Sequence, residues 1–159
     1  MNIHITNGRV VDPASGIDKQ ADIAIADGRI VGIGAIPAGF TAERTIDAAG
    51  CIVAPGLVDL AARLREPGYE HEGMLGSAMA AAVAGGVTSL VCPPDTDPVL
   101  DEPGLVEMLT FRAGKLPGAR LFPLGALTRG LAGGVLTEMA ELTERGCVGF
   151  SQADVPLAD

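Results

Sequence analysis

The feature that most constrains the fold of this 159-residue chain is an alternation of strand-like and helix-like segments in its second part. Short apolar runs alternate with longer runs of helix-forming residues, and glycine or proline separates them. The expected order is strand 52–60, helix 72–84, strand 87–92, helix 104–115, strand 119–128, helix 136–145 and strand 147–151. This alternation predicts a parallel sheet that is covered by helices.

In residues 1–53 apolar residues recur with the period of two that is typical of β-strands. Alternating apolar residues flank Asn7-Gly8 and again Asp27-Gly28. These dipeptides favour the positive φ angles of two-residue hairpin turns. We therefore expect two hairpins in a small antiparallel unit, whose apolar face needs another layer to cover it.

Composition excludes several classes of protein. The net charge of -9 argues against nucleic acid or a membrane surface as a partner, because both favour clustered lysine and arginine. Residues 73–94 contain no charged side chain, but Gly85-Gly86 and Pro93-Pro94 interrupt them, which predicts a buried helix and strand instead of a membrane span. Three cysteines in apolar runs are expected to be buried, in a reducing cytoplasm: Cys51, Cys92 and Cys147.

An apolar run from Ile52 to Leu60 precedes a polar segment from Ala61 to Gly68. Because the run is nearly continuous, it predicts a parallel strand that is covered on both faces. In α/β proteins, the residues that follow the carboxyl end of such a strand commonly form the functional site. We therefore place the candidate site just after residue 60.

Two motifs in this region carry a resemblance to a known family. Pro-Gly-Leu-Val-Asp at 55–59 and Leu-Arg-Glu-Pro-Gly at 64–68 resemble the first barrel strand of dihydroorotases, in the amidohydrolase superfamily. The resemblance covers almost the whole chain and implies an α/β fold. A small antiparallel β-sandwich-like segment at 1–53 would precede the first four strands of a TIM-type (β/α)8 barrel at 54–159. A complete barrel takes about 250 residues, so we expect the N-terminal part of a longer protein.

The metal ligands of the family are replaced. In active members a His-x-His pair on the first strand binds catalytic zinc, and the corresponding residues here are Ala61 and Arg63. A methyl group has no lone pair, and a guanidinium only donates hydrogen bonds. The fourth-strand aspartate that ligates metal in the family corresponds to Gln152, a much weaker ligand for zinc. We expect no cofactor, whereas active relatives hold zinc.

Two further positions match the family's substrate site. Arg65 corresponds to the arginine that binds the substrate carboxylate, although a structural pairing with Glu66 or Asp59 is an equally open interpretation. Asp95 replaces the asparagine of the family motif Met-Pro-Asn-Thr, and its charge would repel that carboxylate. We interpret Arg65 and Asp95 as vestigial substrate-binding residues.

Three functional hypotheses follow. The first is a catalytically inactive dihydroorotase homologue, a cytoplasmic structural subunit in a homo- or hetero-oligomer. The resemblance alone implies its partner, the catalytic chain of aspartate transcarbamoylase in pyrimidine biosynthesis. The second is an active zinc dihydroorotase that interconverts carbamoyl aspartate and dihydroorotate with ligands beyond residue 159. The third is an anion or regulatory-ligand site formed by Arg63 and Arg65.

Overall fold

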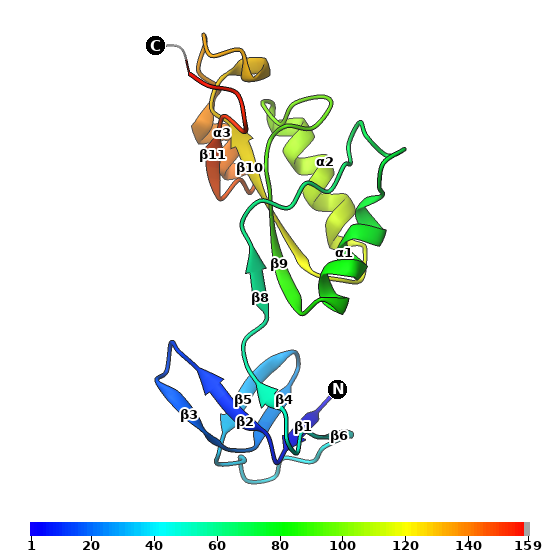
Figure 1. Ribbon diagram of the computed structural model, residues 1–159, viewed down its shortest axis with the longest axis vertical. Helices are drawn as coiled ribbons and strands as arrows, with labels where there is room; N and C mark the ends of the chain where they lie inside the picture. The colour runs from blue at the N-terminus through cyan, green and yellow to red at the C-terminus, as the bar shows by residue number, and fades with distance from the viewer. Residues whose placement is uncertain (158–159) are drawn as a thin grey trace. The chain divides into compact units, whose positions relative to one another are not determined.

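The computed structural model describes residues 1–157 and divides the chain into two compact units, Met1–Pro55 and Gly56–Asp159 (Figure 1). The sequence-based boundary follows residue 53. Each unit has its own strands and its own apolar contacts, and we describe them in turn.

Unit 1 contains two small sheets. Their strands are β1 (Ile3–Thr6), β2 (Arg9–Asp12), β3 (Ile17–Gln20), β4 (Ile23–Ala26), β5 (Arg29–Ile33), β6 (Arg44–Asp47) and β7 (Ile52–Val53). One sheet has the order β5-β4-β1-β6 and the other β3-β2-β7. Antiparallel pairs predominate, and β1–β6 and β2–β7 are parallel. Ile5 and Ile25 of one sheet and Val10 of the other line a common apolar cavity of about 220 Å³, so the sheets cover each other's apolar faces.

Only one of the two expected hairpins forms. Asp27 and Gly28 have φ angles of 50° and 72° and connect β4 to its antiparallel partner β5, as predicted. The prediction of a hairpin around Asn7-Gly8 is wrong, because β1 and β2 do not pair with each other. Instead, β1 pairs with β4 and β6, and β2 pairs with β3 and β7. Gly8 has no positive φ; a Cβ there would lie 2.6 Å from Cγ2 of Val53. Close packing, not turn geometry, requires this glycine.

Unit 2 has the predicted alternation. Its elements are β8 (Leu57–Asp59), α1 (Leu75–Ala84), β9 (Val87–Cys92), α2 (Pro103–Gly114), β10 (Arg120–Ala126), the 3₁₀ turn η1 (Arg129–Leu131), α3 (Met139–Glu144) and β11 (Gly149–Ser151). The strands pair in parallel in the order β8-β9-β10-β11, with α1 against β9 and α2 against β10 (Figure 1). Parallel strands in chain order, joined by helices, are what the first four strands of a (β/α)8 barrel require.

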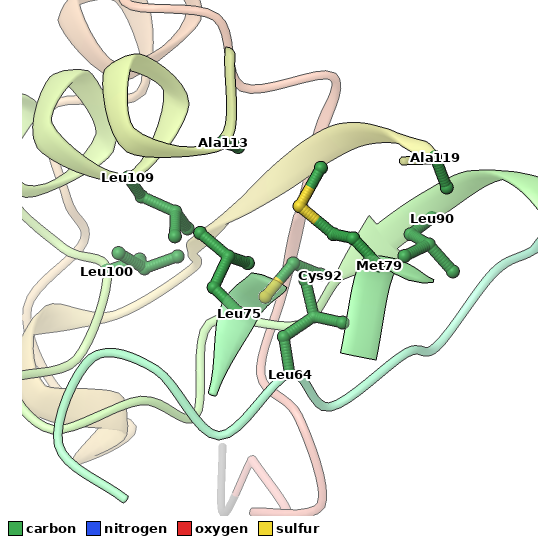
Figure 2. Packing of buried hydrophobic residues seen from close by; sticks show 9 residues of the cluster. All are labelled: Leu64, Leu75, Met79, Leu90, Cys92, Leu100, Leu109, Ala113 and Ala119. Carbon is green, nitrogen blue, oxygen red and sulfur yellow. The ribbon is translucent and has the colours of Figure 1, made fainter. Parts of the chain in front are cut away.

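The main core of unit 2 lies between this sheet and its helices. Leu75 and Met79 of α1 and Leu109 of α2 are at most 2% exposed. Figure 2 shows them packed together with side chains from the strands and connecting loops. The cluster consists of Leu64, Leu75, Met79, Leu90, Cys92, Leu100, Leu109, Ala113 and Ala119.

The strand expected to be buried on both faces is instead exposed. The apolar run is divided between β7 of unit 1 and β8 of unit 2, and Val58 and Leu60 are 58% and 73% exposed. In the described part of the chain β8 is an edge strand with β9 as its one neighbour. A continuous apolar pattern predicted the strand, but it does not show which part of the molecule covers it. No helix within residues 1–157 combines the length and apolar character that a membrane crossing requires.

The cysteines divide into two kinds. Cys92 and Cys147 are buried, as expected, whereas Cys51 is exposed, so that prediction is wrong for Cys51. Burial raises the thiol pKa of Cys92 and of Cys147 from the ordinary value of 9.0 to about 11.

Because the thiolate is the nucleophile, Cys51 should react with an aromatic disulfide reagent at pH 8 well before the other two cysteines. Cys92 and Cys147 should react after unfolding. Burial disfavours the thiolate form of Cys92 and Cys147, so their ionisation favours unfolding. Their contribution to stability is therefore fully present below about pH 9 and is lost as the pH rises to about 11. Mass spectrometry of the labelled peptides checks the order, and rapid native labelling of Cys92 would contradict it.

Candidate functional site

The residues predicted for the site all follow the carboxyl ends of parallel strands. Arg63 follows β8, Asp95 follows β9, and Gln152 follows β11. Because these strands are parallel and lie in one sheet, their carboxyl ends meet at the same edge. The fold therefore brings the predicted positions close together.

Alternation along the chain after β8 decides which side chains reach this edge. The backbone N–H of Ala62 donates to the carbonyl of Val91 at 2.9 Å, so the extended conformation continues beyond the strand. Successive side chains of an extended segment point to opposite faces. Ala62 and Leu64 pack into the helix-covered core, and Ala61 and Arg63 are exposed on the other face. The two positions of the family's histidine pair thus share one face.

Arg63 joins two carboxylates from different strand ends. Its Nε donates to Oδ2 of Asp95 at 2.6 Å, and its Nη2 donates to Oδ2 of Asp154 at 2.6 Å. The Arg63 and Asp95 side chains are 35% and 28% exposed, whereas Asp154 is 86% exposed. The hydrogen bond to Asp95, and then the charge of Asp95, raise the pKa of Arg63 above its ordinary value. Nothing in the sequence indicated this role for Asp154, which lies two residues after Gln152.

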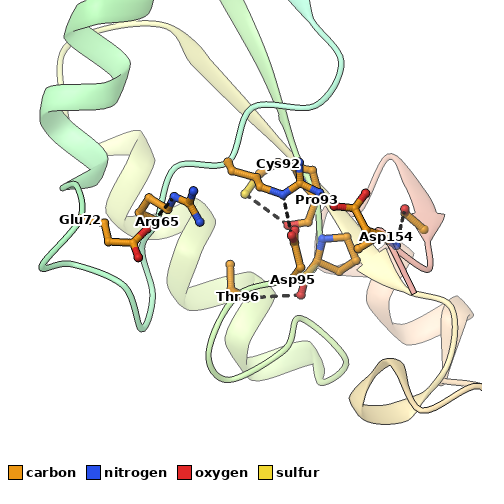
Figure 3. A network of polar contacts seen from close by, with 11 residues as sticks. Arg65, Glu72, Cys92, Pro93, Asp95, Thr96 and Asp154 are labelled. Carbon is orange, nitrogen blue, oxygen red and sulfur yellow. Dashed lines mark hydrogen bonds and ion pairs between the residues drawn. The ribbon is translucent and has the colours of Figure 1, made fainter. Parts of the chain in front are cut away.

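Arg65 does not pair with Asp95, although both residues border the same small cavity. It has a φ of 65°, and its Nε lies 3.1 Å from Oε2 of Glu72. Figure 3 shows this pair apart from Asp95 and Asp154. The alternative prediction that Arg65 pairs with Glu66 or Asp59 is therefore wrong, because the carboxylate beside Arg65 is that of Glu72. Glu66 pairs instead with Arg112, and Asp59 accepts the backbone N–H of Ala61 at 2.9 Å.

The two arginines do not leave an open anion site. Arg63, Arg65 and Asp95 border a cavity of about 10 Å³, together with Tyr69. A cavity of this size has room for about one water molecule. Each guanidinium also has a carboxylate partner already. The geometry gives no support to the hypothesis of an anion or regulatory-ligand site here.

The residues at the family's metal positions do not fit a zinc ion. Ala61 has no lone pair to offer, and Arg63 carries positive charge. Both polar atoms of the Gln152 side chain make hydrogen bonds within the protein: its Oε1 accepts from the Thr128 hydroxyl at 2.9 Å, and its Nε2 donates to the Leu131 carbonyl at 2.8 Å. Within residues 1–157 no cluster of three or more His, Cys, Asp or Glu side chains could hold a metal ion. A catalytic zinc needs about three such ligands.

Comparison with known proteins assigns the family. A family model described as dihydro-orotase-like matches residues 50–158, so the chain belongs to the dihydroorotase-like family. A dihydroorotase-like protein of Pseudomonas aeruginosa is 52% identical over 95% of this chain, and a dihydroorotase of Syntrophotalea carbinolica is 42% identical over 99% of it. The chain spans 36% and 37% of the lengths of these two relatives.

Solved structures agree with the fold. An L-hydantoinase from Arthrobacter aurescens has a TM-score of 0.73 and 29% identity over 93% of this chain and 32% of its own. A D-hydantoinase has a TM-score of 0.74 and 25% identity over 100% of this chain and 35% of its own. The fold is the N-terminal part of an amidohydrolase TIM barrel with its small β domain, as the sequence predicted.

Proposed function

We propose that this chain is part of a catalytically inactive dihydroorotase homologue with a structural role in the cytoplasm. One observation carries the proposal: Arg63, at a position of the family's metal-binding histidine pair, directs its positive charge into the site. The dihydroorotase reaction needs a hydroxide and a Lewis acid supplied by a metal ion. Ala61 and Gln152 at the neighbouring ligand positions provide no replacement for that chemistry.

The proposed partner is the catalytic chain of aspartate transcarbamoylase. Family resemblance supports this choice, since inactive homologues of this kind would assemble with that enzyme in pyrimidine biosynthesis. A homologue that keeps the fold and lacks the metal ligands retains surfaces for assembly while its site no longer turns over substrate. We therefore propose a homo- or hetero-oligomer in which this protein supports an active transcarbamoylase.

The experiment requires the full-length protein, purified alongside an active dihydroorotase as a control. Elemental analysis should find zinc in the control and far less than one equivalent in this protein. Dihydroorotate ring opening should be absent with or without a chelator. When the two genes are coexpressed, aspartate transcarbamoylase should copurify with this protein. Stoichiometric zinc with chelator-sensitive ring opening would refute inactivity, and a fully active transcarbamoylase that elutes alone would refute the partnership.

A second candidate function is that of an active zinc dihydroorotase. The observation in its favour is that relatives at 40–43% identity are named dihydroorotase. In that case the ligands would have to come from outside the described residues. The same zinc and ring-opening assays decide between the two candidates.

A further inference from the structure

The residues at the family's metal-ligand positions make side-chain contacts that connect the ends of different strands. Arg63 after β8 binds Asp95 after β9 and Asp154 after β11. Gln152 after β11 binds Thr128, which follows β10. Side chains that occupy metal-ligand positions therefore link all four strand ends of unit 2.

We infer that Arg63 is a structural cation, which ties the ends of β8, β9 and β11 together in place of a bound metal. This inference rests on the proposed loss of the zinc site, and it adds a specific task for the residue that replaced a ligand. We name the set Arg63, Asp95 and Asp154 the strand-end clamp.

Charge balance supports the clamp. Two carboxylates, one of them only 28% exposed, lie within hydrogen-bonding distance of a single guanidinium. Without Arg63 the two negative charges would have no cation between them, and like charges at short range are unfavourable. The residues that differ from the family motifs at positions 63 and 95 have opposite charges and pair with each other. An aspartate in place of the family's asparagine supplies the anion that a partly buried arginine requires.

The shape of the guanidinium explains why arginine suits this position. Its planar group presents Nε and Nη2 in a fixed arrangement, and each atom donates to a carboxylate from a different strand end. A lysine ammonium is a single point charge on a flexible stem. Its three N–H donors can reach more than one carboxylate, but they rotate freely and do not fix the relative positions of two.

The test compares variants of the full-length protein by hydrogen exchange. In Arg63→Met, the amides of residues 95–97 and 152–155 should exchange about 5-fold faster, because losing hydrogen bonds worth about 1 kcal/mol raises the population of the locally open state by about that factor. Arg63→Lys should show most of the same loss. Arg9→Met is the matched control, since Arg9 pairs with Asp18 at 2.6 and 2.7 Å within one hairpin, and it should leave both segments unchanged.

A double variant keeps the test decisive if Arg63→Met folds poorly. Arg63→Met combined with Asp95→Asn removes the orphaned carboxylate and should recover part of the lost protection or yield. Unchanged exchange in Arg63→Met would overturn the clamp, and full protection in Arg63→Lys would overturn the requirement for a planar guanidinium. These outcomes are distinct from a failure of the proposed function, which would appear as zinc in the unmodified protein.

Discussion

Replacing Glu66 with alanine should lower the free energy of unfolding of the barrel domain by about 3 kcal/mol, at the low end of the range for breaking a buried ion pair. Glu66 is 2% exposed. Its Oε2 accepts the backbone N–H of Leu75 at 2.8 Å, and its Oε1 pairs with Nη2 of Arg112. The substitution removes both interactions at once.

The position of Leu75 explains why the loss is large. Leu75 is the first residue of α1, and Met74 before it provides no side-chain cap. The Glu66 carboxylate therefore satisfies one of the unpaired N–H groups at the start of this helix, and its negative charge suits the helix N-terminus. Arg112 is 46% exposed, so water solvates it after the change, which keeps the cost near the bottom of the range.

Urea unfolding of the full-length protein measures the effect. Glu66→Gln keeps an acceptor for Leu75 and should lose about half as much. The matched control is Glu138→Ala, because Glu138 is 66% exposed and lies 3.3 Å from Arg129 in a surface pair. That variant should lose less than about 1 kcal/mol. Equal losses in Glu66→Ala and Glu138→Ala would show that burial of Glu66 contributes nothing.

Replacing Gly68 with alanine should also cost about 3 kcal/mol, the sum of a backbone cost and a packing cost. Gly68 has a φ of 99°, and a Cβ there would lie 2.2 Å from the carbonyl oxygen of Asp97. The backbone N–H of Asp97 donates to the carbonyl of Pro67 at 3.2 Å, so the two loops are joined at this point. Neither loop can move away without breaking that bond.

A second glycine separates the two costs. Gly86 follows α1 with a φ of 83°, and nothing lies within 4 Å of the Cβ that alanine would add. Gly86→Ala should therefore show the backbone cost alone, about 1–2 kcal/mol. Thermal unfolding of both variants measures the difference. Equal stability of the two variants would contradict a packing cost at Gly68.

The sequence predicted the elements of unit 2 well, because periodicity and glycine or proline boundaries act locally. The strand at Val87–Cys92 has the predicted bounds, and α2 begins and ends within one residue of its expected limits. Unit 1 was harder to predict, since a turn signal such as Asn7-Gly8 shows where the chain reverses but does not name the partner strand. The side chain of Val53 leaves no room for a Cβ at Gly8. This contact depends on the tertiary structure, so the local sequence does not predict it.

The candidate site was predictable in its positions but not in its partners. Strand ends and family motifs located Arg63, Arg65, Asp95 and Gln152, all of which lie at one edge of the sheet. Which carboxylate each arginine binds depends on loop conformation, including the positive φ of Arg65. Asp154 and Glu72 were missed because charged loop residues carry no periodic signal that distinguishes them from a solvated surface.

The pairing of Arg63 with Asp95 bears on which substitutions these two positions tolerate. Histidine at position 63 alone would leave Asp95 without its arginine partner, and asparagine at position 95 alone would leave Arg63 with only the exposed Asp154 as a carboxylate partner. Either single substitution is therefore expected to lower stability, and the two together to lower it less than their sum. Positions 63 and 95 are coupled, so each limits which residues the other can accept.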